Sequence, residues 1–171
     1  VHMSKRSWRH EDEILALVIA AVAIPTVIAL PLIWLHEYEL KSKVTLTLAI
    51  VVGCGSIGER HLRCLQRTRR ARVTACDLNP DLRQRLAATY AVPAVADAGT
   101  AIRSGDFDAA VICTPAHAHV PLATAALDAG MHVLIEKPLS TSLAGVDGLI
   151  AARDRSGRQA AVAYVYHVFP F

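Results

Sequence analysis

Three glycines in the spacing GxGxxG, Gly53, Gly55 and Gly58, constrain the fold of this chain more than any other feature of its sequence. They follow an apolar run of strand length, residues 45–52, and lead into a segment with apolar residues at helical spacing, residues 57–68. A strand that enters a helix through such a loop uses its glycines for a tight turn, for close approach of a ligand, and for close helix packing. The pattern predicts a βαβ unit that holds an anion at the N-terminus of its helix.

Strand-like and helix-like segments alternate along the rest of the chain. Strands are expected at residues 45–52, 71–76, 92–95, 109–114, 132–135 and 160–165. Helices are expected at residues 57–68, 81–90, 120–129 and 143–155, with a short turn at 100–103. Such alternation predicts the α/β class, with a Rossmann-like, doubly wound and mainly parallel sheet covered on both faces. With 171 residues, the chain has room for one such domain and an appendage.

A carboxylate stands where a dinucleotide would need one. Asp77 ends the second expected strand, about twenty residues after the glycine loop, where it can accept hydrogen bonds from the adenosine ribose. Its charge repels a 2′-phosphate, so NAD is favoured over NADP. The alternative is that Asp77 only begins the turn to Pro80 and caps the next helix. Loop, strand and carboxylate together favour dinucleotide binding.

Two further polar groups follow the fourth and fifth expected strands. They are Thr114, Pro115 and His119, and then Glu136, Lys137 and Pro138. The carboxyl ends of parallel strands share one edge, and such sheets bind their ligands there. A lysine desolvated in that crevice can relay a proton, or stay charged and polarise a developing alkoxide. Taken alone, a lysine paired with Glu136 on a solvated loop is the simpler interpretation.

The glycine loop, the TPxxxH pattern from Thr114 to His119 and the EKP motif of residues 136–138 resemble the Gfo/Idh/MocA family of NAD(P)-dependent oxidoreductases, which act mostly on sugars, cyclitols and related polyols. The resemblance covers residues 48–170. It implies hydride transfer between a nicotinamide cofactor and a polyol, with Lys137 as the catalytic residue. The residues then expected at the cofactor are Gly53, Gly55, Ser56, Ile57, Gly58, Asp77, Thr114, Pro115, His119, Glu136, Lys137 and Pro138.

The resemblance also sets the expected domain organisation. Residues 44–166 form the NAD(P)-binding domain, and residues 167–171 begin a crossover in which His167 stands where an arginine is expected. Family members continue into a second α/β domain that forms the substrate wall and carries a catalytic Asp and His pair. Cofactor binding without efficient turnover is therefore expected of this chain alone. By the same resemblance, the Lys137–Pro138 bond is expected to be cis and to aim Lys137 inward.

Residues 1–43 form an N-terminal extension with an uncharged apolar run at residues 14–35. As a helix, this run is long enough to cross about 30 Å of hydrocarbon, although two prolines lie within it. A membrane anchor and an extension that enters no membrane are both left open. The expected location is cytoplasmic, at the inner face of the membrane if the run is an anchor. A membrane-tethered NAD-sensing module without catalysis is the alternative function, but such a module needs neither EKP nor TPxxxH.

Composition excludes several other functions. A net charge of +3 and an aromatic content of 5% argue against a nucleic-acid partner. The four cysteines form no CxxC pair, so neither a zinc site nor a disulfide framework is expected. A metal site made of Cys113, His117 and His119 would have no standard spacing, and no metal is predicted. The sequence does not identify the substrate or the oligomeric state. A non-catalytic scaffold that forms homo-oligomers is a further alternative.

Overall fold

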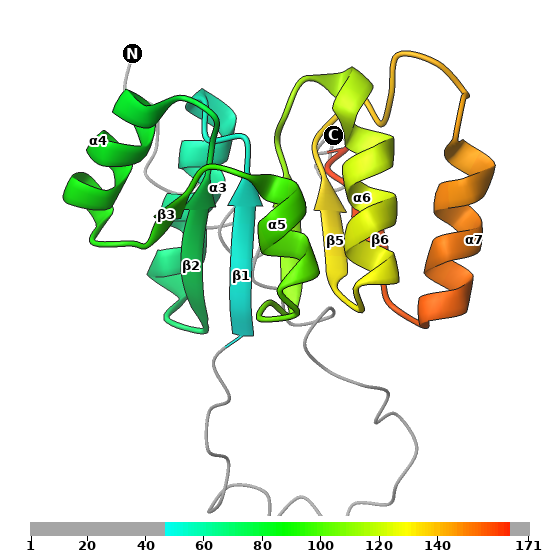
Figure 1. The fold of residues 1–171 in the computed structure, drawn as a ribbon, viewed down its shortest axis with the longest axis horizontal. Coiled ribbons are helices and arrows are strands. Elements are labelled where there is room, and N and C mark those ends of the chain that lie inside the picture. The colour runs from blue at the N-terminus through cyan, green and yellow to red at the C-terminus, as the bar shows by residue number, and fades with distance from the viewer. Residues whose placement is uncertain (1–46, 165–171) are drawn as a thin grey trace, which may run out of the picture.

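The computed structural model describes residues 47–164, which form one six-stranded sheet in the order β3-β2-β1-β4-β5-β6 (Figure 1). The strands are β1 (Thr47–Val52), β2 (Ala71–Cys76), β3 (Ala94–Val95), β4 (Ala109–Ile112), β5 (His132–Ile135) and β6 (Ala160–Val162). Every neighbouring pair is parallel. The order runs outward from β1 in both directions, so the sheet is doubly wound, as the alternating pattern predicted.

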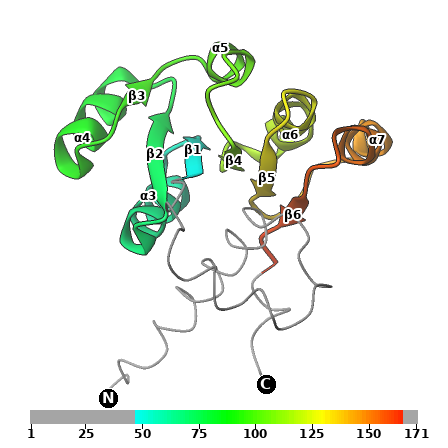
Figure 2. The same ribbon diagram turned by 90° about the horizontal axis from the view of Figure 1, so that it is seen from below.

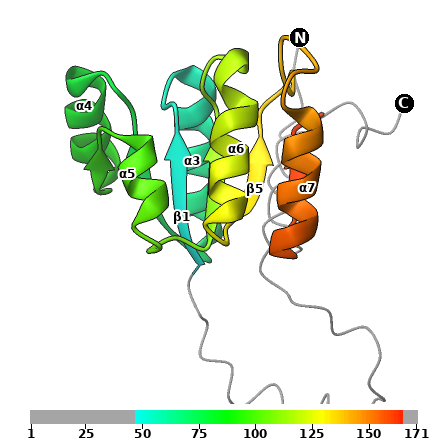
Figure 3. The same ribbon diagram turned by 45° about the vertical axis from the view of Figure 1, so that its right-hand side comes forward.

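Helices cover the two faces of the sheet unequally (Figure 2). The helical segments are α3 (Ser56–Thr68), α4 (Pro80–Tyr90), α5 (Ala98–Arg103), the 3-10 turn η1 (Ala116–Ala118), α6 (His119–Asp128) and α7 (Val146–Ser156). Apolar residues of α3 and α4 form one core with the sheet, and those of α5, α6 and α7 form another. Figure 3 shows α6 and α7 side by side, with α3 behind the sheet.

Strand β1 contributes to both cores. Ile50 and Val52 belong to the core under α5, α6 and α7, whereas Ala49 and Val51 belong to the core under α3 and α4. All four side chains are at most 2% exposed. Burial on both faces explains why the run lacks the alternation of a half-exposed strand, since parallel sheets are covered on both sides.

Several element ends differ from those expected. Helix α4 begins at Pro80, because the Asn79 side chain accepts hydrogen bonds from two backbone amides of the first turn and Pro80 suits a first helical position. Helix α7 begins only at Val146, after Gly145 with φ of +80°. The short turn expected at 100–103 is a helix, since Asp97 caps it through the amide of Thr100.

The expected strands were too long at three places. The third strand contains only Ala94–Val95, the fourth ends at Ile112, and the sixth ends at Val162. The run before Ala94 contains Pro93, which has no N–H to donate to a neighbouring strand. The apolar helix expected at 14–35 lies outside the described residues, as do the extension 1–43 and the crossover 167–171. Within residues 47–164, the helices are too short or too polar to span a bilayer.

Candidate functional site

The glycine loop lies at the carboxyl end of β1, between the two halves of the sheet. Gly53 has φ of +84°, a conformation that side chains rarely adopt, and a Cβ atom there would lie 2.7 Å from the Thr114 nitrogen. A Cβ atom on Gly58 would overlap the carbonyl oxygen of Gly53. Around Gly55 there is open space. The loop is therefore closed against side chains where α3 packs on it and open where a ligand would approach.

The N-terminus of α3 faces this open space without a side-chain cap. The N-cap residue is Gly55, which has no side chain to accept hydrogen bonds from the first amides of the helix. Ser56 and Ile57, both expected at the cofactor, begin the helix and are exposed. The first amides of a helix have no partners within the helix, and its dipole is positive at this end. These groups suit an anion such as a pyrophosphate.

Asp77 lies beside the glycine loop, and its carboxylate accepts a hydrogen bond from the backbone of that loop. Its Oδ2 accepts from the Cys54 nitrogen at 2.7 Å, and its Oδ1 accepts from the Asn79 nitrogen at 2.9 Å. Asp77 thus begins the turn after β2, as the alternative interpretation held. The cap of α4 is Asn79 rather than Asp77, so that part of the alternative is wrong. Each carboxylate oxygen can accept more than one hydrogen bond, which leaves room for ribose hydroxyls.

The turn after β4 contains a hydroxyl without a partner. The Oγ1 atom of Thr114 is buried and has no hydrogen bond within the described part of the chain. Pro115 precedes the 3-10 turn η1 and sets its entry with φ of −56°. Unpaired buried hydroxyls are uncommon in folded proteins. A ligand at the glycine loop could provide the missing partner.

His119 ties this turn to the turn after β5. The side chain is buried, with Nε2 lying 2.6 Å from the Thr114 carbonyl oxygen and Nδ1 lying 2.9 Å from that of Pro138. Carbonyl oxygens only accept hydrogen bonds, so both contacts are hydrogen bonds only when both ring nitrogens carry protons. His119 is therefore placed to support the two turns from behind.

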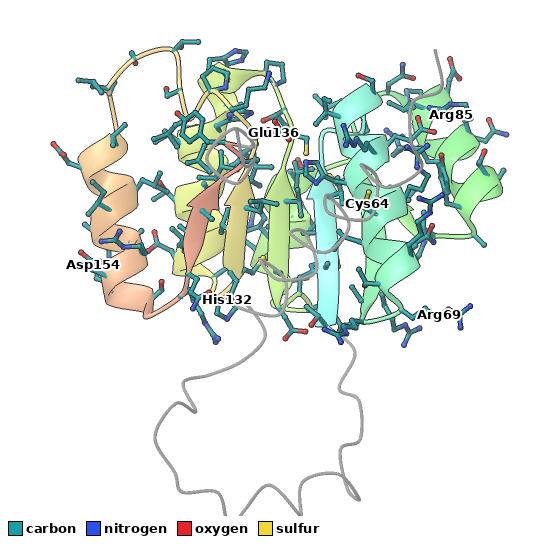
Figure 4. All side chains as sticks on the ribbon, turned by 180° about the vertical axis from the view of Figure 1, so that it is seen from behind. Cys64, Arg69, Arg85, His132, Glu136 and Asp154 are labelled. Atoms are coloured by element: carbon teal, nitrogen blue, oxygen red, sulfur yellow. The ribbon has the colours of Figure 1, made fainter. Side chains whose placement is uncertain are left out.

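The EKP motif follows β5 at the same edge of the sheet, where Figure 4 shows Glu136. The Lys137–Pro138 bond is cis, as the resemblance implied. The side chain of Lys137 is exposed, whereas Glu136 contacts His61 at 2.8 Å and accepts from the Lys137 backbone nitrogen at 3.0 Å. In the described part of the chain, the Lys137 ammonium forms no salt bridge with Glu136, although its charge acts on that carboxylate.

Opposing effects act on the Glu136 carboxyl. Burial raises its pKa, but the hydrogen bond from His61, the charge of His61 and the Lys137 amide and charge lower it more. The net pKa lies below its ordinary value, which keeps Glu136 ionised at neutral pH. His61 was missed because its partner lies 75 residues away in the sequence. Only the expected meeting of α3 with the carboxyl end of β5 could have suggested the contact.

The cysteines near this edge are packing residues. Burial raises the pKa of the Cys54 thiol to about 11 and that of Cys76 to about 12, and it also raises the pKa of Cys113. Such thiols stay protonated and poorly nucleophilic. Across residues 47–164, His, Cys, Asp and Glu form no group of three that could hold a metal ion.

A parallel, doubly wound sheet with a glycine loop where its strand order reverses and a carboxylate at the end of β2 defines a dinucleotide-binding Rossmann domain. Residues 48–164 match the Gfo/Idh/MocA family, described as an oxidoreductase family with an NAD-binding Rossmann fold. The chain belongs to this family.

Its relatives include several dehydrogenases. Inositol 2-dehydrogenase/D-chiro-inositol 3-dehydrogenase of Shouchella clausii is 37% identical over 113 residues, which cover 64% of this chain and 33% of the relative. Inositol 2-dehydrogenase of Klebsiella pneumoniae is 34% identical, with 64% of this chain and 34% of the relative covered. The crystal structure of the WlbA dehydrogenase from Bordetella pertussis with NADH and UDP-GlcNAcA superposes with a TM-score of 0.64 at 29% identity, covering 69% of this chain and 37% of that one. The matched part of the chain thus spans about a third of the length of these curated relatives.

Proposed function

We propose that this chain is the cofactor-binding domain of a dehydrogenase that moves a hydride between NAD and a sugar, a cyclitol or a related polyol. One observation carries the proposal: a single edge of the sheet holds the glycine loop, the Asp77 carboxylate and the EKP turn. The family match and the inositol dehydrogenases among the relatives support this chemistry. NAD, when bound, supplies the group that accepts the hydride.

The chain's own groups divide the work of binding. The first amides of α3, at Ser56 and Ile57, hold the pyrophosphate, and the open space at Gly55 lets it approach the backbone. The Asp77 carboxylate accepts hydrogen bonds from the adenosine ribose. The unpaired hydroxyl of Thr114, next to Gly53, gains a partner on the nicotinamide side.

Lys137 is the group that accepts the hydroxyl proton or stabilises the alkoxide. Oxidation of an alcohol carbon releases a hydride to the cofactor and a proton from the hydroxyl. As a neutral amine, Lys137 accepts that proton; as an ammonium, it stabilises the alkoxide before another base takes the proton. Its exposed side chain can reach a substrate placed over the edge of the sheet.

The cofactor is NAD rather than NADP. Asp77 carries a negative charge where the 2′-phosphate of NADP would lie, and Leu78, the next residue, is 83% exposed and offers no cation. The guanidinium of Arg83, in the helix after this turn, donates hydrogen bonds to the carbonyls of Asp77 and Leu78. These bonds occupy Arg83 Nη1 on the turn.

Calorimetric titration of the purified chain with NAD and NADP tests the proposal. NAD should bind at least about tenfold more tightly than NADP, and Asp77→Asn should remove most of that preference because it removes the repelling charge. Asp81→Asn, which neutralises an exposed carboxylate in the first turn of α4, should leave the preference intact. Failure of both nucleotides to bind would reject the cofactor domain, whereas an unchanged ratio in Asp77→Asn would reject only the assigned role of Asp77.

This chain alone should turn over a polyol poorly. Hydride transfer needs the cofactor, the substrate and a proton acceptor held in near contact, and the described residues form only the cofactor side. An NADH absorbance assay with NAD and inositol should therefore show no rapid reduction of NAD, although calorimetry should show that NAD binds. Reduction at ordinary enzymatic rates would show that the substrate side is also present.

A further inference from the structure

A histidine of α3 contacts the turn that carries Lys137. His61 Nε2 lies 2.8 Å from Glu136 Oε1, and the two side chains are 13% and 16% exposed. His61 stands in the second turn of α3, the helix that starts at the glycine loop. The contact therefore joins the loop that would hold the pyrophosphate to the turn that would hold the catalytic lysine.

Glu136 passes this contact on to the main chain of Lys137. Its Oε2 accepts a hydrogen bond from the Lys137 nitrogen at 3.0 Å. Its own nitrogen donates to the Ile112 carbonyl at 2.9 Å, which fixes the backbone of Glu136 on β4. Glu136 is thus held at its carboxylate by α3 and at its backbone by the sheet. The Lys137 ammonium makes no ion pair with it among the described residues.

Charge strengthens this arrangement. The carboxylate is ionised and partly buried, and hydrogen bonds to a charged acceptor are about twice as strong as neutral ones. Without His61, one oxygen of a partly buried carboxylate would lack its partner. The carboxylate would then turn toward water and release the Lys137 amide.

We propose that His61 is a positioning residue: through Glu136, it fixes the main chain of Lys137 relative to the glycine loop, and so sets where Lys137 lies against the bound cofactor. The inference rests on the proposed function, because it takes NAD to lie along this edge. His61 itself acts through Glu136 and touches neither the cofactor nor the substrate.

The small number of lysines makes the inference directly testable. Lys137 is the only lysine within residues 47–164, and the others are Lys5, Lys41 and Lys43. Trace acetylation of the full chain, read by mass spectrometry, gives the modification rate of Lys137 relative to these internal references. The ratio of that rate without NAD to that with saturating NAD measures how closely Lys137 approaches the cofactor.

The wild-type chain should show clear protection of Lys137 by NAD. His61→Leu removes the hydrogen bond and should lower this protection about tenfold, the factor expected for one lost hydrogen bond to a charged group. His61→Gln keeps an N–H donor of similar reach and should restore most of it. Arg67→Leu, on the exposed side of the same helix, is the matched control and should leave the protection unchanged.

The outcomes separate the inference from the proposed function. Absence of protection in the wild-type chain would overturn the proposed position of Lys137 beside the cofactor. Protection that is equal in wild type and His61→Leu would overturn the positioning role, even if the variant unfolds at a lower temperature. If His61→Leu does not fold, Glu136→Gln decides: it preserves the size of the side chain and removes the charge, so unchanged protection there would reject the inference.

Discussion

The two halves of the candidate site are held by different means. The glycine loop is held mainly by the backbone: Gly53 and Gly58 pack closely against main-chain atoms, and the Gly53 amide donates to the Cys76 carbonyl at 2.8 Å. One side chain, the Asp77 carboxylate, adds a hydrogen bond from the Cys54 amide. The turns after β4 and β5 are held largely by two histidine side chains, His61 and His119. The first half therefore depends mainly on the absence of side chains at Gly53 and Gly58, and the second depends mainly on two side chains that join separate elements.

This difference decides what each half tolerates. At Gly53 and Gly58, an added Cβ atom meets backbone neighbours that cannot easily move aside. At a turn held by side chains, a substitution removes hydrogen bonds but leaves space for the chain to adjust. We therefore expect the largest losses of stability in the glycine loop, smaller losses at the histidines, and the smallest at exposed pairs.

Gly58→Ala should have the largest effect. Its methyl group would overlap the Gly53 carbonyl oxygen, so α3 must move away from β1. We expect the free energy of unfolding to fall by at least about 3 kcal/mol, at the upper end for overpacked sites, with loss of NAD binding. Urea denaturation followed by circular dichroism measures the first effect, and calorimetry the second.

Gly148→Ala is the matched control for this change. Gly148 lies within α7, and a Cβ atom there meets nothing within 4 Å. Alanine has the higher helix propensity, so this variant should be about 0.5–1 kcal/mol more stable than the wild type. Equal behaviour of the two variants would contradict a specific close contact at Gly58.

His119→Ala should have an intermediate effect. It removes a buried ring and its contacts with the partly buried carbonyls of Thr114 and Pro138, and it should lower the free energy of unfolding by about 2 kcal/mol. His117→Ala, two residues earlier in η1 and exposed, should change stability by less than about 0.5 kcal/mol. If His119→Ala lowered the free energy of unfolding as much as Gly58→Ala, the proposed difference between the two halves would be wrong.

The same difference explains what the sequence could predict. Glycine spacing, the Asp77 position and burial on both faces of β1 are local or periodic signals, and the fold and the cofactor side follow from them. The doubly wound order was confirmed in this way. The family resemblance added the cis bond at Lys137–Pro138.

The other half could not be predicted because its contacts join residues far apart in the sequence. His61 and Glu136 are 75 residues apart, and nothing in the helical pattern of α3 distinguishes a histidine that pairs from one that faces water. His119 was expected at the cofactor from its motif, and that motif gave no sign that its ring lies between two backbone carbonyls. The exact ends of helices could not be predicted for a related reason. Several neighbouring residues in one turn can serve as the helix cap, and only the structure shows that Asn79 caps α4.

The smallest expected effect lies on the outer surface of the backbone-held half, where Glu59 of α3 pairs with α4. Its Oε2 accepts from Arg85 at 2.6 Å and its Oε1 accepts from Tyr90 at 2.7 Å. The Arg85 and Tyr90 hydrogen bonds lower the pKa of Glu59 to about 2, from an ordinary 4.5. A folded pKa below the unfolded one adds stability above the unfolded value and loses it as the pH falls toward the folded value.

The wild-type chain should therefore lose more thermal stability than Glu59→Gln as the pH falls from about 5 to about 2. The difference should be small, because Arg85 is half exposed and water screens the pair. Asp128→Asn, which breaks the exposed pair with Arg155, serves as the control and should show no comparable dependence. Identical pH profiles for the wild type and Glu59→Gln would mean that the charge of Glu59 adds no stability to the contact between α3 and α4.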